Sequence, residues 1–193
     1  RMTVRVALLT YSTRPRGGVV HTLALAEALA RHGADVTVHA LGRGGDHGFF
    51  RPVDPAVSVR LAPLPDLPGE TVGARVLRSI DALAASVDPR AYDVVHAQDC
   101  ISANAVAGGL AGVIRTVHHL DHFTTPELAR CHERAIVTPV AHVCVSRAVA
   151  VSRMGTAQVA TPDLVTQDGD VVYLAVAVGH LEEVDKHLAG ATR

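Results

Sequence analysis

Hydrophobic and polar positions near the start of the chain predict a strand, a helix and a second strand. Residues 4–10 form a nearly continuous apolar run, a turn-like segment follows, and residues 20–32 repeat apolar positions with helical spacing. Gly33 supplies a left-handed stop for this helix, and residues 35–41 form the next apolar run. This order predicts a right-handed βαβ unit with parallel strands.

The same alternation of strands and helices continues to about residue 150. Further strands are expected at 57–61, 92–97, 113–118 and 141–145, and further helices around Val76 and Ile80, from near Ile101, and from Thr125 and Pro126. A proline-marked loop is expected to start at Pro63. These elements predict an α/β domain over residues 1–150 with a doubly wound, Rossmann-like parallel sheet. Residues 151–193 read as strand, Asp-Gly turn, strand and helix, which predicts a small C-terminal α+β appendage.

Composition narrows the class of protein. The chain has 193 residues, 48% of them hydrophobic, and a formal net charge of -1, so a nucleic-acid partner is not expected. Its three cysteines have no C-x-x-C spacing, which argues against a disulfide framework and favours a reducing, cytoplasmic location. No apolar run approaches the ~20 residues of a membrane span and the first residues lack a signal-peptide pattern, so integral membrane contact is not expected.

The glycine pair after the first strand is the first candidate site. In an open parallel sheet, ligands bind beyond the carboxyl ends of the strands. Gly17 and Gly18 precede a helix there, where bare backbone amides and the helix dipole favour a phosphate. The alternative is that the two glycines only form the turn. A dinucleotide is disfavoured, because the G-x-G-x-x-G pattern is absent and Asp35 stands at the start of the second strand instead of its end.

Histidines after the 113–118 strand form the second candidate site. His118 and His119 can hydrogen-bond a sugar hydroxyl or stabilise charge, because a neutral imidazole both donates and accepts. A structural role is equally open. The metal alternative uses His118, His122, Cys131 and His132 as zinc ligands, but their spacing matches no standard zinc framework, so no metal is expected.

Charged residues follow two other strands. Arg43 and Asp46 are expected to be solvated loop residues. Asp99 either belongs to the site or caps the next helix, and the sequence leaves both roles open.

Four segments taken together resemble the N-terminal domain of glycosyltransferase family 4, one half of a GT-B fold. They are "VRVALLTYSTRPRGGVVHTLALAEALARHGADVTVHAL", "YDVVHAQD", "IRTVHHLDHF" and "HVCVSRA", within residues 3–150. The resemblance implies a two-domain enzyme that transfers a sugar from a nucleotide-diphosphate sugar to an acceptor with retention of anomeric configuration, without a metal or other cofactor. Its active site lies between the two domains.

The resemblance also implies roles for individual residues. Gly17 and Gly18 would face the donor diphosphate, and His118 would lie beside the transferred sugar as the catalytic-site histidine. The acceptor side would be lined by Arg14, Arg16, His21, Asp99 and His119. This division agrees with chemistry, because a diphosphate leaving group needs positioned donors more than it needs a base.

The sequence also departs from the family pattern. The family's second domain carries two glutamates eight positions apart, and no such pair occurs here; only about 40 residues follow the first domain. The expectation is therefore an acceptor-binding half whose donor site is completed by a partner chain or a dimer. Residues 154–190 resemble the C-terminal regulatory module of RCK-type potassium-uptake proteins.

Two other classes of function stay open at this point. One is a non-catalytic ligand-binding or regulatory protein, suggested by the absent donor half and the RCK-like tail. The other is a nicotinamide-dependent oxidoreductase, which rests on fold class alone and is disfavoured by the missing glycine fingerprint.

Overall fold

The computed structural model describes residues 3–108, 112–118 and 123–144, together with three short strands at 150–153, 156–159 and 171–173. The elements of the main domain are β1 (Arg5–Thr10), α1 (Gly17–Arg31), β2 (Asp35–Arg43), β3 (Val57–Leu64), α2 (Val72–Ser86), the 3₁₀ turn η1 (Pro89–Ala91), β4 (Val94–Ala97), α3 (Cys100–Val106), β5 (Val113–Val117), α4 (Pro126–Val137) and β6 (Ala141–Cys144).

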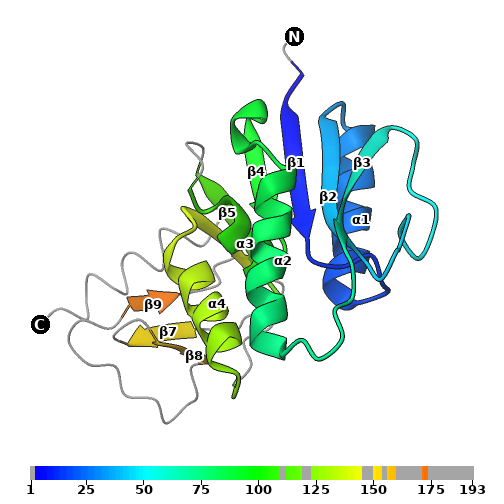
Figure 1. The fold of residues 1–193 in the computed structure, drawn as a ribbon. Coiled ribbons are helices and arrows are strands. Elements are labelled where there is room, and N and C mark those ends of the chain that lie inside the picture. Colours follow the sequence, from blue (N-terminus) through cyan, green and yellow to red (C-terminus); the bar gives the residue numbers. More distant parts are fainter. Residues whose placement is uncertain are drawn as a thin grey trace, which may run out of the picture.

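Six parallel strands form one sheet in the order β3-β2-β1-β4-β5-β6. The chain starts in the middle with β1, builds outward to β3, and then returns to the other side of β1. Helix α1 covers one face of the sheet, and α2, α3 and α4 lie on the opposite face (Figure 1). The predicted doubly wound, Rossmann-like α/β fold is confirmed.

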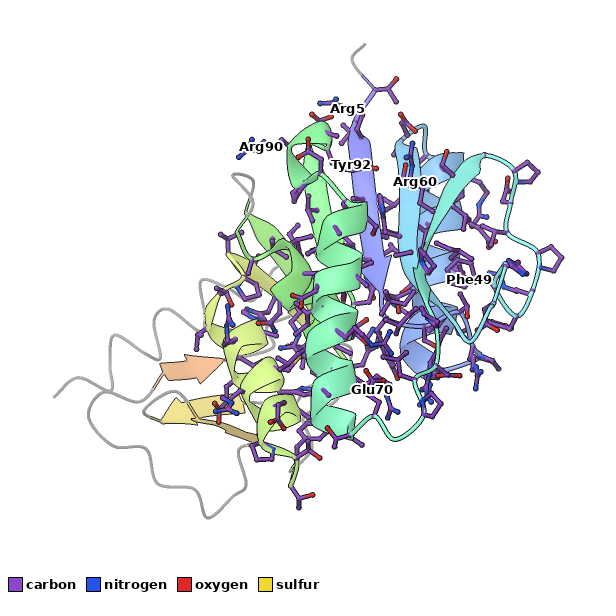
Figure 2. The ribbon with its side chains drawn as sticks, in the orientation of Figure 1. Arg5, Phe49, Arg60, Glu70, Arg90 and Tyr92 are labelled. Atoms are coloured by element: carbon purple, nitrogen blue, oxygen red, sulfur yellow. The ribbon has the colours of Figure 1, made fainter. Side chains whose placement is uncertain are left out.

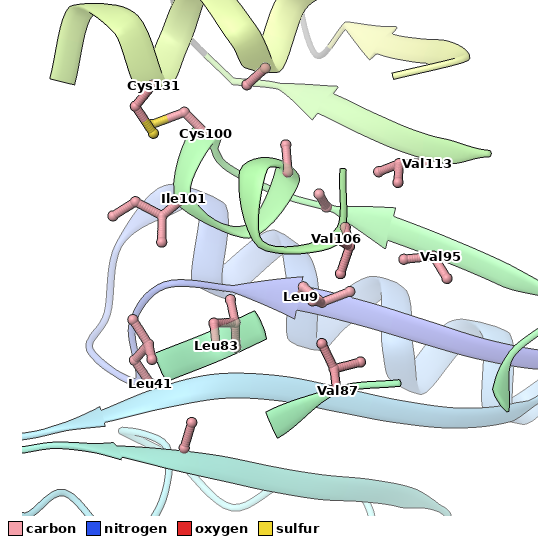
Figure 3. Packing of buried hydrophobic residues seen from close by; sticks show 14 of the residues in the cluster. Leu9, Leu41, Leu83, Val87, Val95, Cys100, Ile101, Val106, Val113 and Cys131 are labelled. Carbon is pink, nitrogen blue, oxygen red and sulfur yellow. The ribbon is translucent and has the colours of Figure 1, made fainter. Parts of the chain in front are cut away.

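Alternation along β1 explains why both faces of the sheet are covered. Val6 and Leu8 belong to the core cluster that packs under α1, while Ala7 and Leu9 belong to the larger cluster under α2 and α3 (Figure 3). Successive side chains of a strand point to opposite faces, so a continuous apolar run needs a helix layer on each side.

Two predicted boundaries were wrong for identifiable reasons. Helix α1 begins at Gly17 instead of Val20, because the two glycines wind into its first turn. Strand β3 runs through Pro63 to Leu64, where a loop was predicted. Because β3 is an edge strand, it accommodates a proline without losing a ladder bond on its open side.

The signals that end and begin helices behaved as predicted. Gly33 has a φ of 89° and follows the C-cap of α1, which is the left-handed stop expected there. Thr125 and Pro126 are the N-cap and first residue of α4, although the Thr125 side chain makes no capping hydrogen bond.

A second, antiparallel sheet lies in the C-terminal region. Its strands are β7 (Ala150–Arg153), β8 (Thr156–Val159) and β9 (Val171–Tyr173), in the order β8-β7-β9. The helix predicted near the end of the chain lies outside the described residues. The domain boundary at residue 150 and the RCK-like resemblance stay predictions.

Candidate active site at the carboxyl ends of the strands

A cavity of about 600 Å³ opens where β1, β4 and β5 end. The segment that follows β1 and the segment that follows β4 meet there, and α2 and α4 form its outer wall. The residues that line it include Tyr11, Arg14, Arg16, Gly17, Gly18, Arg43, Arg75, Gln98, Asp99, Ile101, Arg115, His118, Phe123 and Leu128. This is the edge at which open parallel sheets bind ligands.

The first turn of α1 reaches this cavity with its backbone amides uncapped by side chains. Arg16 is the N-cap and makes no side-chain capping bond, and the first turn carries no acidic residue. A Cβ placed on Gly17 would meet nothing within 4 Å. The turn therefore offers open N–H groups and the positive end of the helix dipole to an anion.

Gly18 packs directly against His118. A Cβ on Gly18 would lie 3.4 Å from Cδ2 and 3.5 Å from Nε2 of the His118 ring. A larger side chain at this position would have to push the ring away. The glycine pair and the histidine, 100 positions apart in sequence, thus form one wall of the cavity.

Gln98 joins His118 to His21. The carbonyl oxygen Oε1 of Gln98 lies 3.2 Å from Nε2 of His118 and 3.1 Å from Nδ1 of His21, and the two rings meet edge to face at 5.1 Å. A carbonyl oxygen only accepts, so both ring nitrogens donate to it. A neutral His118 in this arrangement therefore carries its proton on Nε2.

Asp99 lines the cavity and also accepts hydrogen bonds from two backbone amides. Its carboxylate accepts the Ser102 amide at 2.8 Å in a capping box at the start of α3, and it accepts the Tyr11 amide at 2.9 Å. Burial raises the pKa of this carboxyl. The capping role left open by the sequence is thus confirmed, and Asp99 also ties the β1–α1 loop to α3.

The arginines of the cavity differ in their partners. Arg43 binds Asp66 at 2.8 Å, and Nε of Arg14 lies 3.8 Å from Oδ2 of Asp46. The Arg16 guanidinium lies 5.8 Å from the centre of the Tyr11 ring. Arg43 and Asp46 are therefore paired and not merely solvated, and Arg43 is the last residue of β2 instead of a loop residue. Arg115 differs from these arginines, because its Nε and Nη1 are buried without a hydrogen-bond partner in the described structure.

The site residues expected from the sequence largely come together. Arg14, Arg16, Gly17, Gly18, Asp99 and His118 line the cavity. His21 does not line it and reaches it through Gln98. His119 lies outside the described residues.

Two lining residues, Gln98 and Arg115, were not among the expected site residues. Gln98 was only part of the segment after β4, and its histidine partners lie 77 and 20 positions away, so no local pattern signals the contact. Arg115 did carry a signal, because a charged residue interrupts the apolar strand VIRTV.

The described part of the chain bears on two alternatives, a metal site and a membrane-spanning helix. Among the described residues, no group of three or more His, Cys, Asp or Glu side chains is arranged to hold a metal ion; His122 of the zinc alternative lies outside them. Within that same part of the chain, no helix combines the length and apolar character needed to cross a membrane.

Comparison with solved structures agrees with the fold. Sucrose-phosphate synthase from Thermosynechococcus elongatus superposes with a TM-score of 0.54 at 14% identity, over 72% of this chain and 42% of that one. The structure of LpCGTa in complex with UDP is 18% identical with a TM-score of 0.40, over 60% of this chain and 30% of that one. The chain therefore spans less than half the length of either structure. No curated protein matches its sequence.

The superposition on sucrose-phosphate synthase shows that the six-stranded sheet corresponds to one half of a GT-B fold. The sequence model of Glycosyltransferase Family 4 matches residues 15–165, which include the uncapped first turn of α1, the Gly18–His118 wall and Gln98. The chain belongs to glycosyltransferase family 4.

Proposed function

We propose that this chain is the acceptor-binding half of a retaining glycosyltransferase, which transfers a sugar from a nucleotide-diphosphate sugar to an acceptor. The observation that carries the proposal is the wall formed by Gly18 and His118 beside the uncapped first turn of α1. It combines an anion-binding backbone with an imidazole in a single cavity.

The donor diphosphate is assigned to the first turn of α1. Negative charge grows on the diphosphate as its bond to the sugar breaks, and fixed amides at a helix N-terminus stabilise that charge without reorganising. Gly17 and Gly18 let the phosphate oxygens approach the backbone closely. No metal or other cofactor is part of this proposal.

His118 is assigned a place beside the transferred sugar. Gln98 holds its Nε2–H, and Gly18 packs against the ring at Cδ2 and Nε2. Acceptor contacts are assigned to Arg14, Arg16, His21 and His119. Asp99 contributes by fixing the Tyr11 amide and the start of α3.

The nucleotide and sugar require a second half to complete the donor site. The chain covers 42% of sucrose-phosphate synthase, and the family resemblance implies that most donor contacts lie on the other domain. We propose that a second domain or a partner chain supplies them.

Calorimetric titration with UDP, GDP and their sugar conjugates tests this function. The chain is expected to bind a diphosphate nucleotide, and Gly18→Trp is expected to abolish binding by filling the space against His118. Gly48→Ala is expected to retain binding, because Gly48 does not line the cavity and its Cβ would meet no atom within 4 Å. Circular dichroism checks that both variants fold. Unchanged affinity in Gly18→Trp would refute the assignment of the diphosphate to α1.

A further inference from the structure

Arg115 lies in the middle of β5, and its side chain is buried. The residue is 2% exposed, yet it lines the cavity. Its Nε and Nη1 have no hydrogen-bond partner in the described structure. A buried charge without a partner is costly, so residues of this kind are retained where something else supplies the counter-charge.

The neighbours of Arg115 do not supply that charge. The groups that act electrostatically on the pKa of the Arg115 guanidinium are Asp99 and the cysteines Cys100, Cys131 and Cys144. Asp99 is occupied by the Tyr11 and Ser102 amides, and no carboxylate of the described residues comes within ion-pair distance of Arg115. Both Cys100 and Cys131 are buried free thiols that lie against each other (Figure 3). The hydrogen bond with Cys131 and, after it, burial raise the pKa of Cys100, which keeps this thiol neutral.

Arg115 comes from a different strand than the diphosphate site assigned above. The first turn of α1 follows β1, whereas Arg115 is on β5, and β4 lies between these two strands. The wall nearest to α3 and α4 also contains apolar side chains, those of Ile101, Phe123 and Leu128. The cavity thus offers a guanidinium beside an apolar surface, in addition to the uncapped helix end.

We propose that Arg115 binds an acidic group of the acceptor, a carboxylate or a phosphate, while the apolar wall holds the body of the same molecule. The inference rests on the proposed function and names its acceptor class. A guanidinium presents paired N–H donors that match both kinds of anion, and an occupied pair removes the cost of its burial.

Binding of small probes tests the assignment. Inorganic phosphate and benzoate, each titrated at constant ionic strength with chloride as reference, are followed by thermal shift and calorimetry. At least one probe is expected to bind the chain saturably, and Arg115→Met is expected to weaken it by about 10-fold or more. Preference for benzoate indicates a carboxylic acid acceptor, and preference for phosphate indicates a phosphorylated one.

A matched variant separates a specific site from general positive charge. Arg75 also lines the cavity, from α2, and Arg75→Met removes one charge there while leaving Arg115 intact. Its affinity for the probe is expected to stay close to that of the unchanged chain. Equal losses in the two variants, or no saturable binding of either probe, would overturn the proposal. Arg115→Lys keeps the charge and loses the paired donors, so it gives the same test if Arg115→Met does not fold.

Titration with UDP distinguishes this inference from the proposed function. Arg115→Met is expected to bind UDP as the unchanged chain does. Loss of probe binding with UDP binding retained supports an acid-binding acceptor site beside a working donor site. UDP binding without any Arg115-dependent probe binding refutes the inference alone, and Arg115-dependent probe binding without UDP binding refutes only the donor assignment.

Discussion

Two arginines on parallel strands of one sheet lie in opposite environments. Arg5, at the amino edge beside Tyr92 and Arg90 in Figure 2, is exposed and binds Asp93 through its backbone amide at 2.8 Å, Nε at 3.3 Å and Nη2 at 2.9 Å. Arg115, beside the last residue of β4, is buried and has no ion-pair partner in the described structure. The accessible charge is neutralised, and the inaccessible one is not.

The contrast between Arg5 and Arg115 shows where this fold retains a charge that lowers its stability. An exposed arginine costs little with or without a partner, because water solvates it. A buried, unpaired guanidinium opposes folding, and among the described residues Arg115, which lines the cavity, is the arginine in this state. Strain of this kind is expected where a ligand completes the structure.

Two buried histidines on the strands that flank β1 give the largest expected effect. His39 bonds Tyr92 at 2.8 Å and His96 bonds Thr116 at 2.7 Å, and burial lowers the pKa of each to about 4. The folded chain then binds fewer protons than the unfolded chain between pH 6.5 and 4. Stability is therefore expected to fall as pH drops through that window, by at most about 3 kcal/mol for each histidine.

Urea denaturation between pH 7 and 4.5 measures this slope. His39→Gln and His96→Gln remove one titrating group each and are expected to flatten it separately. Equal flattening of the slope in the two variants would show that the two histidines contribute equally to the acid sensitivity. A stability that does not change over this range would contradict the neutral state assigned to both rings.

Removing the unpaired charge is expected to stabilise the ligand-free chain. Arg115→Met exchanges a buried guanidinium for an apolar side chain of similar reach, and replacements of this kind raise the free energy of unfolding by about 1–4 kcal/mol. Arg78→Met is the matched opposite, because it strips the Glu70 carboxylate, only 8% exposed, of its partner and is expected to destabilise. Urea denaturation at neutral pH measures both, and destabilisation by Arg115→Met would mean that the guanidinium has a structural partner.

The fold was largely predictable from the sequence because its signals are local. Apolar runs bounded by turn residues gave all six strands of the main sheet, and Gly33 and Pro126 marked helix ends. The errors at Gly17 and Pro63 share a cause. Glycine and proline were read as breaks, whereas tertiary position lets one start a helix and the other lie in an edge strand.

The site was predictable only as far as its residues follow strands. Glycines before a helix and histidines after a strand carry a positional signal, so Gly18 and His118 were found. Their direct contact was not predictable, because it depends on how α1 packs beside β5. Gln98 was missed for the same reason.

Removing the Gln98 side-chain oxygen, the acceptor that His21 and His118 share, is expected to lower stability less than the changes above, and its effect is expected to stay within the cavity. Gln98→Leu deprives the ring N–H groups of His21 and His118 of a partner, and each lost bond costs about 1 kcal/mol. Nitrogen NMR of the imidazoles is expected to show loss of the single Nε2–H tautomer of His118. Gln98→Glu keeps an acceptor oxygen and is expected to preserve it, so a mixed tautomer in the unchanged chain would refute the arrangement.

The smallest effect is expected at the amino edge, which completes the comparison. Arg5 and Asp93 have side chains that are 51% and 45% exposed, and water compensates either one for loss of the other. The pKa of Asp93 is lowered to about 2 by the side-chain and backbone bonds from Arg5, so any stabilisation it gives is lost only as pH falls below about 4. At pH 7, Asp93→Asn is expected to leave the melting temperature unchanged within error in 0.5 M salt, roughly three times physiological strength. A clear loss there would show that the exposed pair organises the β1–β4 contact, and would reverse the contrast with Arg115.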